Sequence, residues 1–350
     1  MNQNSYRELI TTTGGGPVKR VLRLCLRLIA AAYGLVVRLR NLCYDKQWFK
    51  SHDAPVPVIS VGNITTGGTG KTPLVIWLCN LLAKKGQNCA VLTRGYKTQP
   101  GILSDEPAIL AKSCPSAKIV VNPDRIAGAQ KAVKEHDADV IVMDDGFQHR
   151  KLKRELDIIT IDATCPFGCE RILPAGLLRE PTTALKRAHL AVITHADNLQ
   201  QDELADLEDK IRSLNPHITI AKAAYKHPCA IGIKGLTLTI DQLKQKPFFV
   251  FCGIANPNLF FDSLKQIGMN LLGSRIYNDH HNYKAQDFSD IYEQAKYLGA
   301  EMILTTQKDW VKTALLAQKN EDIIFAYLAL ELDFPQGYDK IESLIDNVLK

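Results

Sequence analysis

A glycine-rich segment follows the first strongly apolar run in the body of the chain. Residues 58–61 read VISV, residues 62–72 read GNITTGGTGKT, and Pro73 opens a run with helical periodicity. A buried strand, a glycine turn and a helix N-terminus together direct backbone N–H groups and the helix dipole toward phosphate groups. In such a loop Lys71 binds the β- and γ-phosphates and the Thr72 hydroxyl is a ligand of Mg²⁺. The residues expected to bind the nucleotide are Thr65, Thr66, Gly67, Gly68, Thr69, Gly70, Lys71 and Thr72.

The loop departs at one position from the common phosphate-loop pattern GxxxxGK[ST]. That pattern has glycine where this chain has Thr65. A plain glycine turn is the alternative interpretation. A GGTGKT segment directly after an apolar strand, with proline early in the following helix, favours the phosphate loop.

Two adjacent carboxylates, Asp144 and Asp145, follow the apolar run 140–143. In a parallel sheet the carboxyl end of such a strand lies near the phosphate loop, where a carboxylate can hold Mg²⁺ directly or through water. Neighbouring carboxylates repel each other unless a cation lies between them or one is solvated. A capping turn before Gly146 is the structural alternative.

Phosphate transfer to an alcohol also needs a group that orients or deprotonates the hydroxyl. The candidates are Asp105, within the segment SDEP, and three histidines, His149, His280 and His281. Any one histidine is more often structural than catalytic. The residues alone therefore indicate ATP, magnesium, and either transfer or hydrolysis.

The elements that would position these groups follow a repeating pattern. Apolar runs at 56–61, 89–93, 118–121, 140–143, 158–161, 190–194 and 219–223 predict strands, and residues 72–85 and 125–135 predict helices between them. The runs are continuous rather than alternating, which is typical of parallel strands buried on both faces. The expected fold is α/β: a P-loop NTPase-like, mostly parallel sheet with helices on both faces.

The rest of the chain predicts a second, smaller α/β domain. Residues 51–225 form the expected kinase core, residues 226–247 a linker rich in turn residues and lysine, and residues 248–350 a domain that closes over the cleft. Its expected strands are 248–252, 274–277, 302–305 and 323–328, and its expected helices are 258–266, 285–298 and one from about residue 338. A cleft between two domains is a usual place for a small-molecule site.

Charge is concentrated at the N-terminus. The net charge of the 350 residues is +6, but residues 1–50 hold nine basic and two acidic residues, so residues 51–350 sum to −1. A nearly neutral body argues against nucleic-acid binding. The nine cysteines include no CxxC pair, which favours free thiols in a reducing compartment over a zinc site.

The basic N-terminal segment, residues 1–50, predicts a flexible leader followed by an amphipathic helix. Residues 21–37 are apolar apart from two arginines, and the longest uncharged run, 28–37, has ten residues, against about 20 for a bilayer span. At about 100° per residue, Arg20, Arg23, Arg27 and Arg38 share one side of the helix. This pattern favours a helix that lies on an anionic membrane surface. Docking on the protein's own core is the alternative, and the interrupted apolar run disfavours a signal peptide.

Longer blocks carry a resemblance to a known family. In order along the chain they are PVPVISVGNITTGGTGKTP, LTRGY, SDEP, VMDDGFQHRKLKRELDI, LPAGLLREP, CGIANP, NDHHNY and TTQKDWVK, and they span residues 55 to 312. In order and spacing these blocks resemble the lipid A 4′-kinase family. The family's loop shares the threonine at position 65, while Ser104 departs from the glycine expected before Asp-Glu-Pro.

The resemblance implies an ATP- and Mg²⁺-dependent phosphotransferase of lipid A synthesis. Its acceptor would be the 4′-hydroxyl of a tetraacylated glucosamine disaccharide 1-phosphate, embedded in the membrane. It would act at the cytoplasmic face of the inner membrane of a Gram-negative-type bacterium, as a peripheral or monotopic protein. No obligate protein partner and no nucleic acid is expected.

The resemblance also implies roles for individual residues. Asp105 and His280 would form a base dyad, with partners from different domains. Asp144 and Asp145 would handle the metal. The positions implied near the acceptor or the transferred phosphate are Tyr96, Arg179 and Glu180.

Two other functions share some of these features. A membrane-recruited P-loop ATPase or GTPase, acting as a switch or assembly factor, would need the loop and the acidic pair but no base dyad. The guanine-specific motif NKxD is absent from the sequence, and its nearest approach is QKDW at 307–310. A non-catalytic lipid-binding protein would not need an intact Lys71, Thr72, Asp144 and Asp145.

Overall fold

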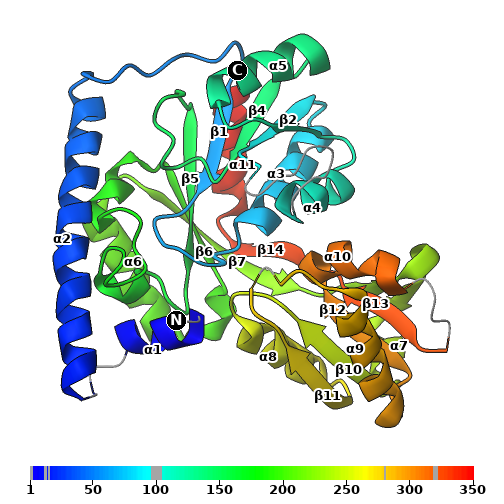
Figure 1. The fold of residues 1–350 in the computed structure, drawn as a ribbon. Helices are drawn as coiled ribbons and strands as arrows, with labels where there is room; N and C mark the ends of the chain where they lie inside the picture. Colours follow the sequence, from blue (N-terminus) through cyan, green and yellow to red (C-terminus); the bar gives the residue numbers. More distant parts are fainter. Residues whose placement is uncertain (1–2, 12–13, 15, 96–104, 280, 318–321) are drawn as a thin grey trace. The chain divides into compact units, whose positions relative to one another are not determined.

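The structure is a computed structural model that describes every residue except 1–2, 12–13, 15, 96–104, 280 and 318–321 (Figure 1). The described residues form two compact units. The first comprises described residues of 1–96, 113–224 and 332–350, and the second those of 97–112 and 225–331. Each unit has a sheet of its own.

The first unit is built on a sheet of order β14-β7-β6-β5-β1-β4-β2-β3. Its strands are β1 (Val58–Gly62), β2 (Cys89–Thr93), β3 (Lys118–Val121), β4 (Val140–Asp144), β5 (Leu156–Asp162), β6 (Leu190–Thr194), β7 (Thr219–Lys226) and β14 (Glu331–Gln336). Every residue of β1, β2, β4, β5 and β6 is buried, as their continuous apolar sequences predict. β1 pairs in parallel with β4 and β5. The predicted mostly parallel sheet is confirmed.

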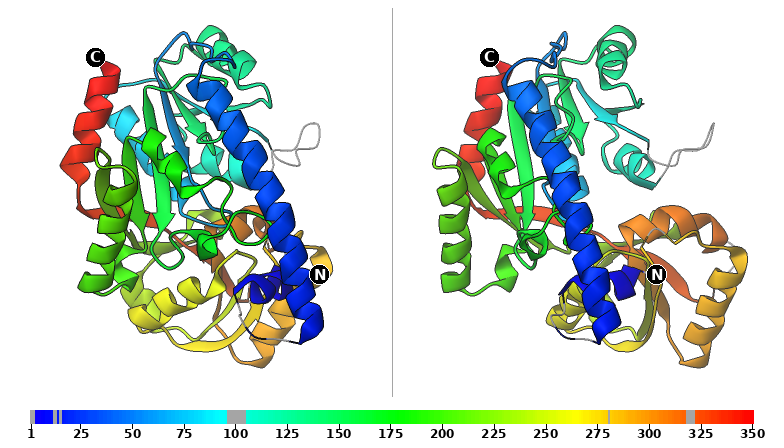
Figure 2. Two further views of the ribbon diagram at one scale, coloured as in Figure 1. Left: turned by 90° about the vertical axis from the view of Figure 1, so that its left-hand side faces the viewer. Right: turned by 60° about the vertical axis from the view of Figure 1, so that its left-hand side comes forward.

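Helices cover this sheet. They are α1 (Gln3–Thr11), α2 (Pro17–Asp45), α3 (Lys71–Lys84), α5 (Arg125–His136), α6 (Gln201–Leu214) and α11 (Tyr338–Leu349). α3 packs on β1, β2 and β4, α5 packs on β2 and β3, and α11 packs on β5. Figure 2 shows α2 as one continuous helix along the side of this unit.

The register of β1 against β4 brings the two predicted phosphate-handling segments together. Val61 pairs with Asp144, so the glycine loop and the acidic pair leave the sheet at the same edge. Gly62 ends β1 where the chain after the acidic pair crosses it. A Cβ at Gly62 would lie 2.6 Å from the Cβ of Phe147, so this crossing requires glycine.

The second unit has a sheet of order β11-β10-β12-β13-β8-β9. Its strands are β8 (Cys229–Gly232), β9 (Thr237–Thr239), β10 (Phe248–Cys252), β11 (Leu271–Ile276), β12 (Met302–Thr306) and β13 (Ile324–Leu328). Its helices are α4 (Asp105–Ser113), α7 (Ile240–Lys244), α8 (Pro257–Ile267), α9 (Ala285–Tyr297) and α10 (Gln307–Ala317). β10 to β13 pair in parallel, whereas β8 pairs antiparallel with β13 and β9.

The division of the chain differs from the expected one at four places. The segment expected to be a flexible leader contains the helix α1, whose Leu9 and Ile10 are buried at 4% and 6% exposure. The segment expected to be a linker, 226–247, contributes β8, β9 and α7 to the second unit. The C-terminal helix α11 belongs to the first unit, because β14 joins that unit's sheet. α4 up to Lys112 groups with the second unit, so Asp105 and the segment around residue 280 share a unit instead of coming from two domains.

Candidate active site

The glycine loop joins β1 to α3 with the geometry expected of a phosphate loop. Gly70 is the N-cap of α3 with φ 81°, and Gly67 has φ 114°, both conformations that glycine adopts most easily. α3 begins at Lys71, so the first free N–H groups of the helix lie directly after the loop. Gly67 and Gly68 are exposed. The loop can therefore present its backbone to an anion.

Thr65, the residue that departs from the common loop pattern, points into the protein. It is 4% exposed and forms an antiparallel bridge with Leu178. A Cβ built on Gly168 would lie 3.1 Å from the methyl carbon of Thr65. The threonine therefore anchors the loop to the segment 168–178 and takes no space from the phosphate side.

A layer of buried hydrogen bonds supports the loop. Asn63 Nδ2 donates to Thr69 Oγ1 at 2.8 Å, and the Thr69 and Thr160 hydroxyls are 2.7 Å apart. Gln148 Nε2 donates to the Asn63 carbonyl at 2.8 Å. The Thr194 hydroxyl donates to the Thr69 carbonyl at 3.2 Å. Such a layer fixes the loop before any ligand binds, which is the preorganisation that phosphate transfer needs.

Three charged side chains meet at the mouth of the loop. Asp145 lies 3.3 Å from Lys71 Nζ and accepts two hydrogen bonds from Arg179 Nη1, at 2.8 and 2.9 Å. Burial alone would raise the pKa of Asp145, but the charges of Lys71 and Arg179 outweigh it and hold that pKa below its ordinary value. Two cations and a carboxylate are thus in place where a triphosphate would enter.

The donor set beside the loop fits a magnesium ion. Thr72 is the second residue of α3, and Asp144, at the end of β4, is 4% exposed. Among the described residues no group of three His, Cys, Asp or Glu side chains could hold a metal ion. Mg²⁺ is commonly held by one or two protein oxygens, with waters and phosphate oxygens completing its shell. Thr72, Asp144 and Asp145 are oxygen donors of that kind.

Arg125 is a further candidate for binding phosphate, and the sequence motifs do not reveal it. It is 4% exposed at the start of α5, and its Nη1 donates to the Asn122 carbonyl at 2.7 Å. Its Nε is buried without a hydrogen-bond partner. Burial lowers its pKa, and the charge of Asp144 partly offsets this. The signal available in sequence was an arginine four residues after the predicted strand 118–121, at the carboxyl end of that strand.

His149 is held neutral near this site. Burial, reinforced by the charges of Arg125, Arg154 and Arg40, lowers the pKa of His149 to about 4. Its Nε2 is buried without a partner. At neutral pH the imidazole is therefore uncharged.

This shift makes folding stability depend on pH. Because the pKa of His149 is about 4 in the folded protein and 6.5 ordinarily, acid protonates the unfolded chain first. The contribution of neutral His149 to the free energy of unfolding is therefore complete above pH 6.5, and it is lost as the pH falls toward 4. Between pH 7.5 and 5.5 we expect the wild type to lose about 1 kcal/mol more stability than His149→Gln, after discounting for partial exposure. Urea unfolding at both pH values measures this, and equal losses in the two proteins would contradict it.

Arg179 and Glu180 have different environments although they are adjacent. The Arg179 side chain reaches Asp145, and its backbone N–H donates to the Ile64 carbonyl at 2.7 Å. Glu180 is 1% exposed and accepts from Arg187 Nη2 at 2.8 Å and from Asn41 Nδ2 at 3.3 Å. Arg179 thus lies at the mouth of the loop, while Glu180 ties α2 to the segment that carries Arg179.

The second unit holds part of the expected base. Tyr96 and His280 lie outside the described residues; Asp105 starts α4, but its side chain is likewise not described. Next to residue 280, Asp279 pairs with Lys308 Nζ at 2.8 Å. His281 Nε2 lies 3.2 Å from Asp287 and its ring stacks on Tyr277. His281 is therefore already engaged within its own unit.

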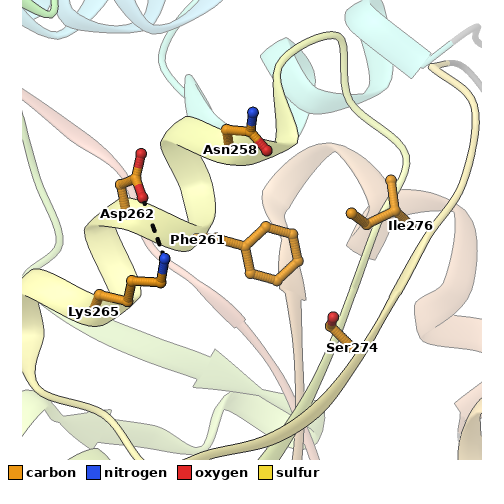
Figure 3. A pocket seen from close by; sticks show the side chains of 6 residues that line it. All are labelled: Asn258, Phe261, Asp262, Lys265, Ser274 and Ile276. Carbon is orange, nitrogen blue, oxygen red and sulfur yellow. Dashed lines mark ion pairs between the residues drawn. The ribbon is translucent and has the colours of Figure 1, made fainter. Parts of the chain in front are cut away.

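A pocket of about 410 Å³ lies in the second unit between α8 and the edge strand β11 (Figure 3). Its lining residues are Asn258, Phe261, Asp262, Lys265, Ser274 and Ile276. None of the predicted site residues whose side chains the structure describes lines it. An ion pair joins Asp262 to Lys265 across 3.7 Å on its helical wall.

Comparison with known proteins gives a consistent result. The family model described as tetraacyldisaccharide-1-P 4′-kinase matches residues 22–350. The chain is 36% identical over 362 residues to the tetraacyldisaccharide 4′-kinase of Geobacter sulfurreducens, covering 98% of each chain. It is 35% identical over 354 residues to that of Chlorobaculum tepidum, covering 95% of this chain and 99% of the relative. Among solved structures it is similar to LpxK from Aquifex aeolicus in complex with ATP, with a TM-score of 0.74, 28% identity and coverage of 94% of this chain and 100% of that one.

Proposed function

Because the chain belongs to the tetraacyldisaccharide 4′-kinase family, we propose that it transfers the γ-phosphate of ATP to the 4′-hydroxyl of a tetraacylated glucosamine disaccharide 1-phosphate. The protein is an ATP-dependent phosphotransferase with an alcohol acceptor, in lipid A synthesis. The observation that carries the proposal is the convergence of Lys71 and Arg179 on Asp145 at the mouth of the glycine loop.

The charges at the loop suit phosphate transfer. In the transition state negative charge spreads over the oxygens of the transferred group, and fixed cations stabilise it there. Lys71 and Arg179 are held in place by Asp145 before the nucleotide binds. When ATP enters, its phosphates compete with Asp145 for the two cations. Asp145 is then free to face the metal or the acceptor.

We assign the magnesium ligands to Thr72 and Asp144, with Asp145 close by. Bound there, Mg²⁺ would neutralise charge on the β- and γ-phosphates. The hydroxyl of Thr72 and the carboxylate of Asp144 suit this hard cation.

The protein residues assigned to the acceptor are proposed from the family resemblance. Asp105 and His280 are the proposed base dyad, in which the carboxylate orients the imidazole and the imidazole takes the proton of the 4′-hydroxyl. Tyr96 and Arg179 are the proposed contacts of the acceptor or of the transferred phosphate, and Glu180 is proposed beside them. The grouping of α4 with the described residues of 225–331 supports the dyad, since Asp105 and both neighbours of residue 280 then belong to one compact unit.

The surface of α2 supports action at a membrane. A narrow strip containing Ala30, Gly34 and Val37 is buried against the first unit. Many other apolar side chains of α2 face outward, and those at least half exposed are Val18, Val21, Leu24, Leu28, Ile29, Leu35, Val36 and Leu39. On a wheel of about 100° per residue, the exposed Arg20, Arg27 and Arg38 lie between the buried strip and one side of this apolar arc. An uncovered apolar arc with an arginine border fits a helix at the headgroup level of an anionic leaflet.

No described helix is both long enough and apolar enough to cross a bilayer. We propose peripheral attachment through α2 to the cytoplasmic face of the inner membrane. The acyl chains of the acceptor would stay in the bilayer while its sugar reaches the phosphate loop.

A transfer assay tests the function. Purified protein is incubated with γ-labelled ATP, Mg²⁺ and the tetraacylated disaccharide 1-phosphate in mixed micelles, and label is followed into the lipid. Acceptor-dependent labelling that collapses in Asp105→Ala and His280→Ala is the expected result. If label were released only as free phosphate, with or without lipid, the result would favour the membrane-recruited ATPase over the kinase.

Vesicle binding tests the role of α2. Leu28 and Leu35 are 65% and 59% exposed, so replacing both by aspartate removes apolar surface without disturbing packing. We expect binding to vesicles with anionic lipid to fall more than about 10-fold, with an unchanged melting temperature. Leu315→Asp, at an equally exposed leucine of the second unit, is the control. Equal binding by the double variant and wild type would exclude this attachment.

A further inference from the structure

The carboxyl ends of β10, β11 and β12 gather three motifs at one edge of the second unit's sheet. The segment CGIANP follows β10, NDHHNY follows β11, and TTQKDWVK spans the end of β12 and the start of α10. β10 pairs in parallel with both neighbours, so all three strands end on the same side. Ligands of open α/β sheets bind outside this edge. Apart from His280 of the second motif, the residues of these three motifs had no role in the phosphate chemistry described above.

Asp309 joins these three motifs. Its carboxyl group is completely buried, yet it lies at the start of a helix and not in the apolar core. Oδ2 accepts from the Gly253 backbone N–H at 2.9 Å and from the Thr306 hydroxyl at 2.7 Å. Oδ1 accepts from the Tyr283 hydroxyl at 3.1 Å. One side chain of α10 thus holds the segments after β10 and after β11.

The atoms around Asp309 are packed so closely that a side chain at Gly253 would not fit. A Cβ on Gly253 would lie 2.9 Å from the Tyr283 hydroxyl and 3.2 Å from Asp309 Oδ1. Burial, together with the charge of Asp309, raises the pKa of Tyr283 far above its ordinary value, so its hydroxyl remains a donor. The Tyr283 ring packs edge-on against Phe251 and Tyr277. The segment is therefore fixed by both packing and hydrogen bonds.

Two lysines of α10 hold the residues on both sides of position 280. Lys308 Nζ pairs with the Asp279 carboxylate at 2.8 Å, and these side chains are only 22% and 15% exposed. Lys312 Nζ donates to the His281 carbonyl at 3.1 Å. Lys308 and Lys312 are one helical turn apart, so they lie on the same face of α10. The same helix therefore holds Asp279, His281 and Tyr283.

We propose that Lys308, Asp309 and Lys312 are positioning residues that fix Asp279, His281 and Tyr283, the residues around position 280, for phosphate transfer. This proposal rests on the proposed function, in which His280 belongs to the base dyad. α10 would act by setting the backbone on each side of that histidine, without touching substrate. Misplacing a reacting group by about 1 Å can cost about 100-fold in rate, so a fixed backbone is worth the burial of these charges.

Lys308→Met tests the proposal, because it keeps the length of the side chain and removes its charge. We expect kcat to fall about 10- to 100-fold with KM for ATP and for the acceptor lipid changed less than about threefold. Lys308→Arg should recover most of the rate. Lys296→Met is the matched control, since Lys296 forms an exposed ion pair with Asp322 in the same unit. A kcat within twofold of wild type, or a loss that only follows the folded fraction, would overturn the proposal.

Hydrogen exchange separates this proposal from the proposed function. In Lys308→Met, and in the near-isosteric Asp309→Asn, peptides covering 277–284 should exchange faster, while those of β10 stay protected. Unchanged exchange in both variants would overturn positioning whatever the activity. The wild type could instead lack acceptor-dependent transfer while the variants still exchange faster. That result would contradict the proposed function and would show that α10 has only a structural role.

Discussion

Lys71→Ala is expected to lower phosphate transfer about 1,000-fold or more while leaving the fold intact. Lys71 is at the first position of α3, with its Nζ 3.3 Å from Asp145 and a side chain 15% exposed. Removing it takes away a cation fixed where charge develops on the transferred group. Stability should change by less than about 1 kcal/mol, because alanine favours the helix and Asp145 keeps Arg179 as its partner.

The measurement is kcat/KM for ATP in the transfer assay, together with nucleotide affinity and melting temperature. Lys84→Ala is the matched control, because Lys84 is an exposed lysine at the other end of the same helix. Retention of more than about a tenth of the wild-type rate would mean that Lys71 does not bind the transferred phosphate. If only Lys84→Ala lost phosphate transfer, the nucleotide would have to bind at another place.

The fold was predictable where burial is uniform. β2, β6 and β10 have the bounds that the apolar runs predict, because a strand covered on both faces is apolar throughout. The edge strand β3 was also predicted with its observed bounds, although only Val120 of its four residues is buried. Prediction failed for β8, β9 and β14, which lie toward the edges of their sheets. β8 is CAIG and ends in glycine, β9 is only TLT, and β14 is ELDFPQ, with two acidic residues and a proline. Nothing in a segment such as 331–336 indicates that it joins the first unit's sheet. Its place is decided by long-range pairing, which a local pattern does not contain.

The candidate site likewise contains residues that the sequence predicted and residues that it did not. The phosphate loop and the acidic pair were found because each is a contiguous motif beside a strand. The contact of Arg179 with Asp145 joins residues 34 positions apart, and only the fold brings them together. Arg125 was missed because its sequence looks like an ordinary helix start, capped by Asp124. For α2 the sequence revealed the arginine side, but the position of the buried strip depends on what the helix packs against.

Glu180→Gln is expected to destabilise the protein by about 3 kcal/mol. Glu180 is 1% exposed and pairs with Arg187, whose side chain is 17% exposed, at 2.8 Å. Glutamine keeps the shape and one acceptor but leaves the arginine buried without its countercharge, and breaking a buried pair costs about 3–5 kcal/mol. Urea unfolding measures the loss. Glu170→Gln is the control: Glu170 is 71% exposed and paired with Lys210, so its loss should leave the unfolding midpoint almost unchanged.

The same variant decides between two roles for Glu180. If it mainly anchors α2 through Asn41 and holds the segment that carries Arg179, the folded variant should keep its KM for the acceptor within about threefold. If its buried Oε1, which has no hydrogen-bond partner, contacts the acceptor, that KM should rise more than about 10-fold. A stable variant with a raised KM would favour the contact over the anchor. An unstable variant with a normal KM would show that burial of this carboxylate serves the attachment of α2, because a group 1% exposed reaches substrate only if the helix moves away.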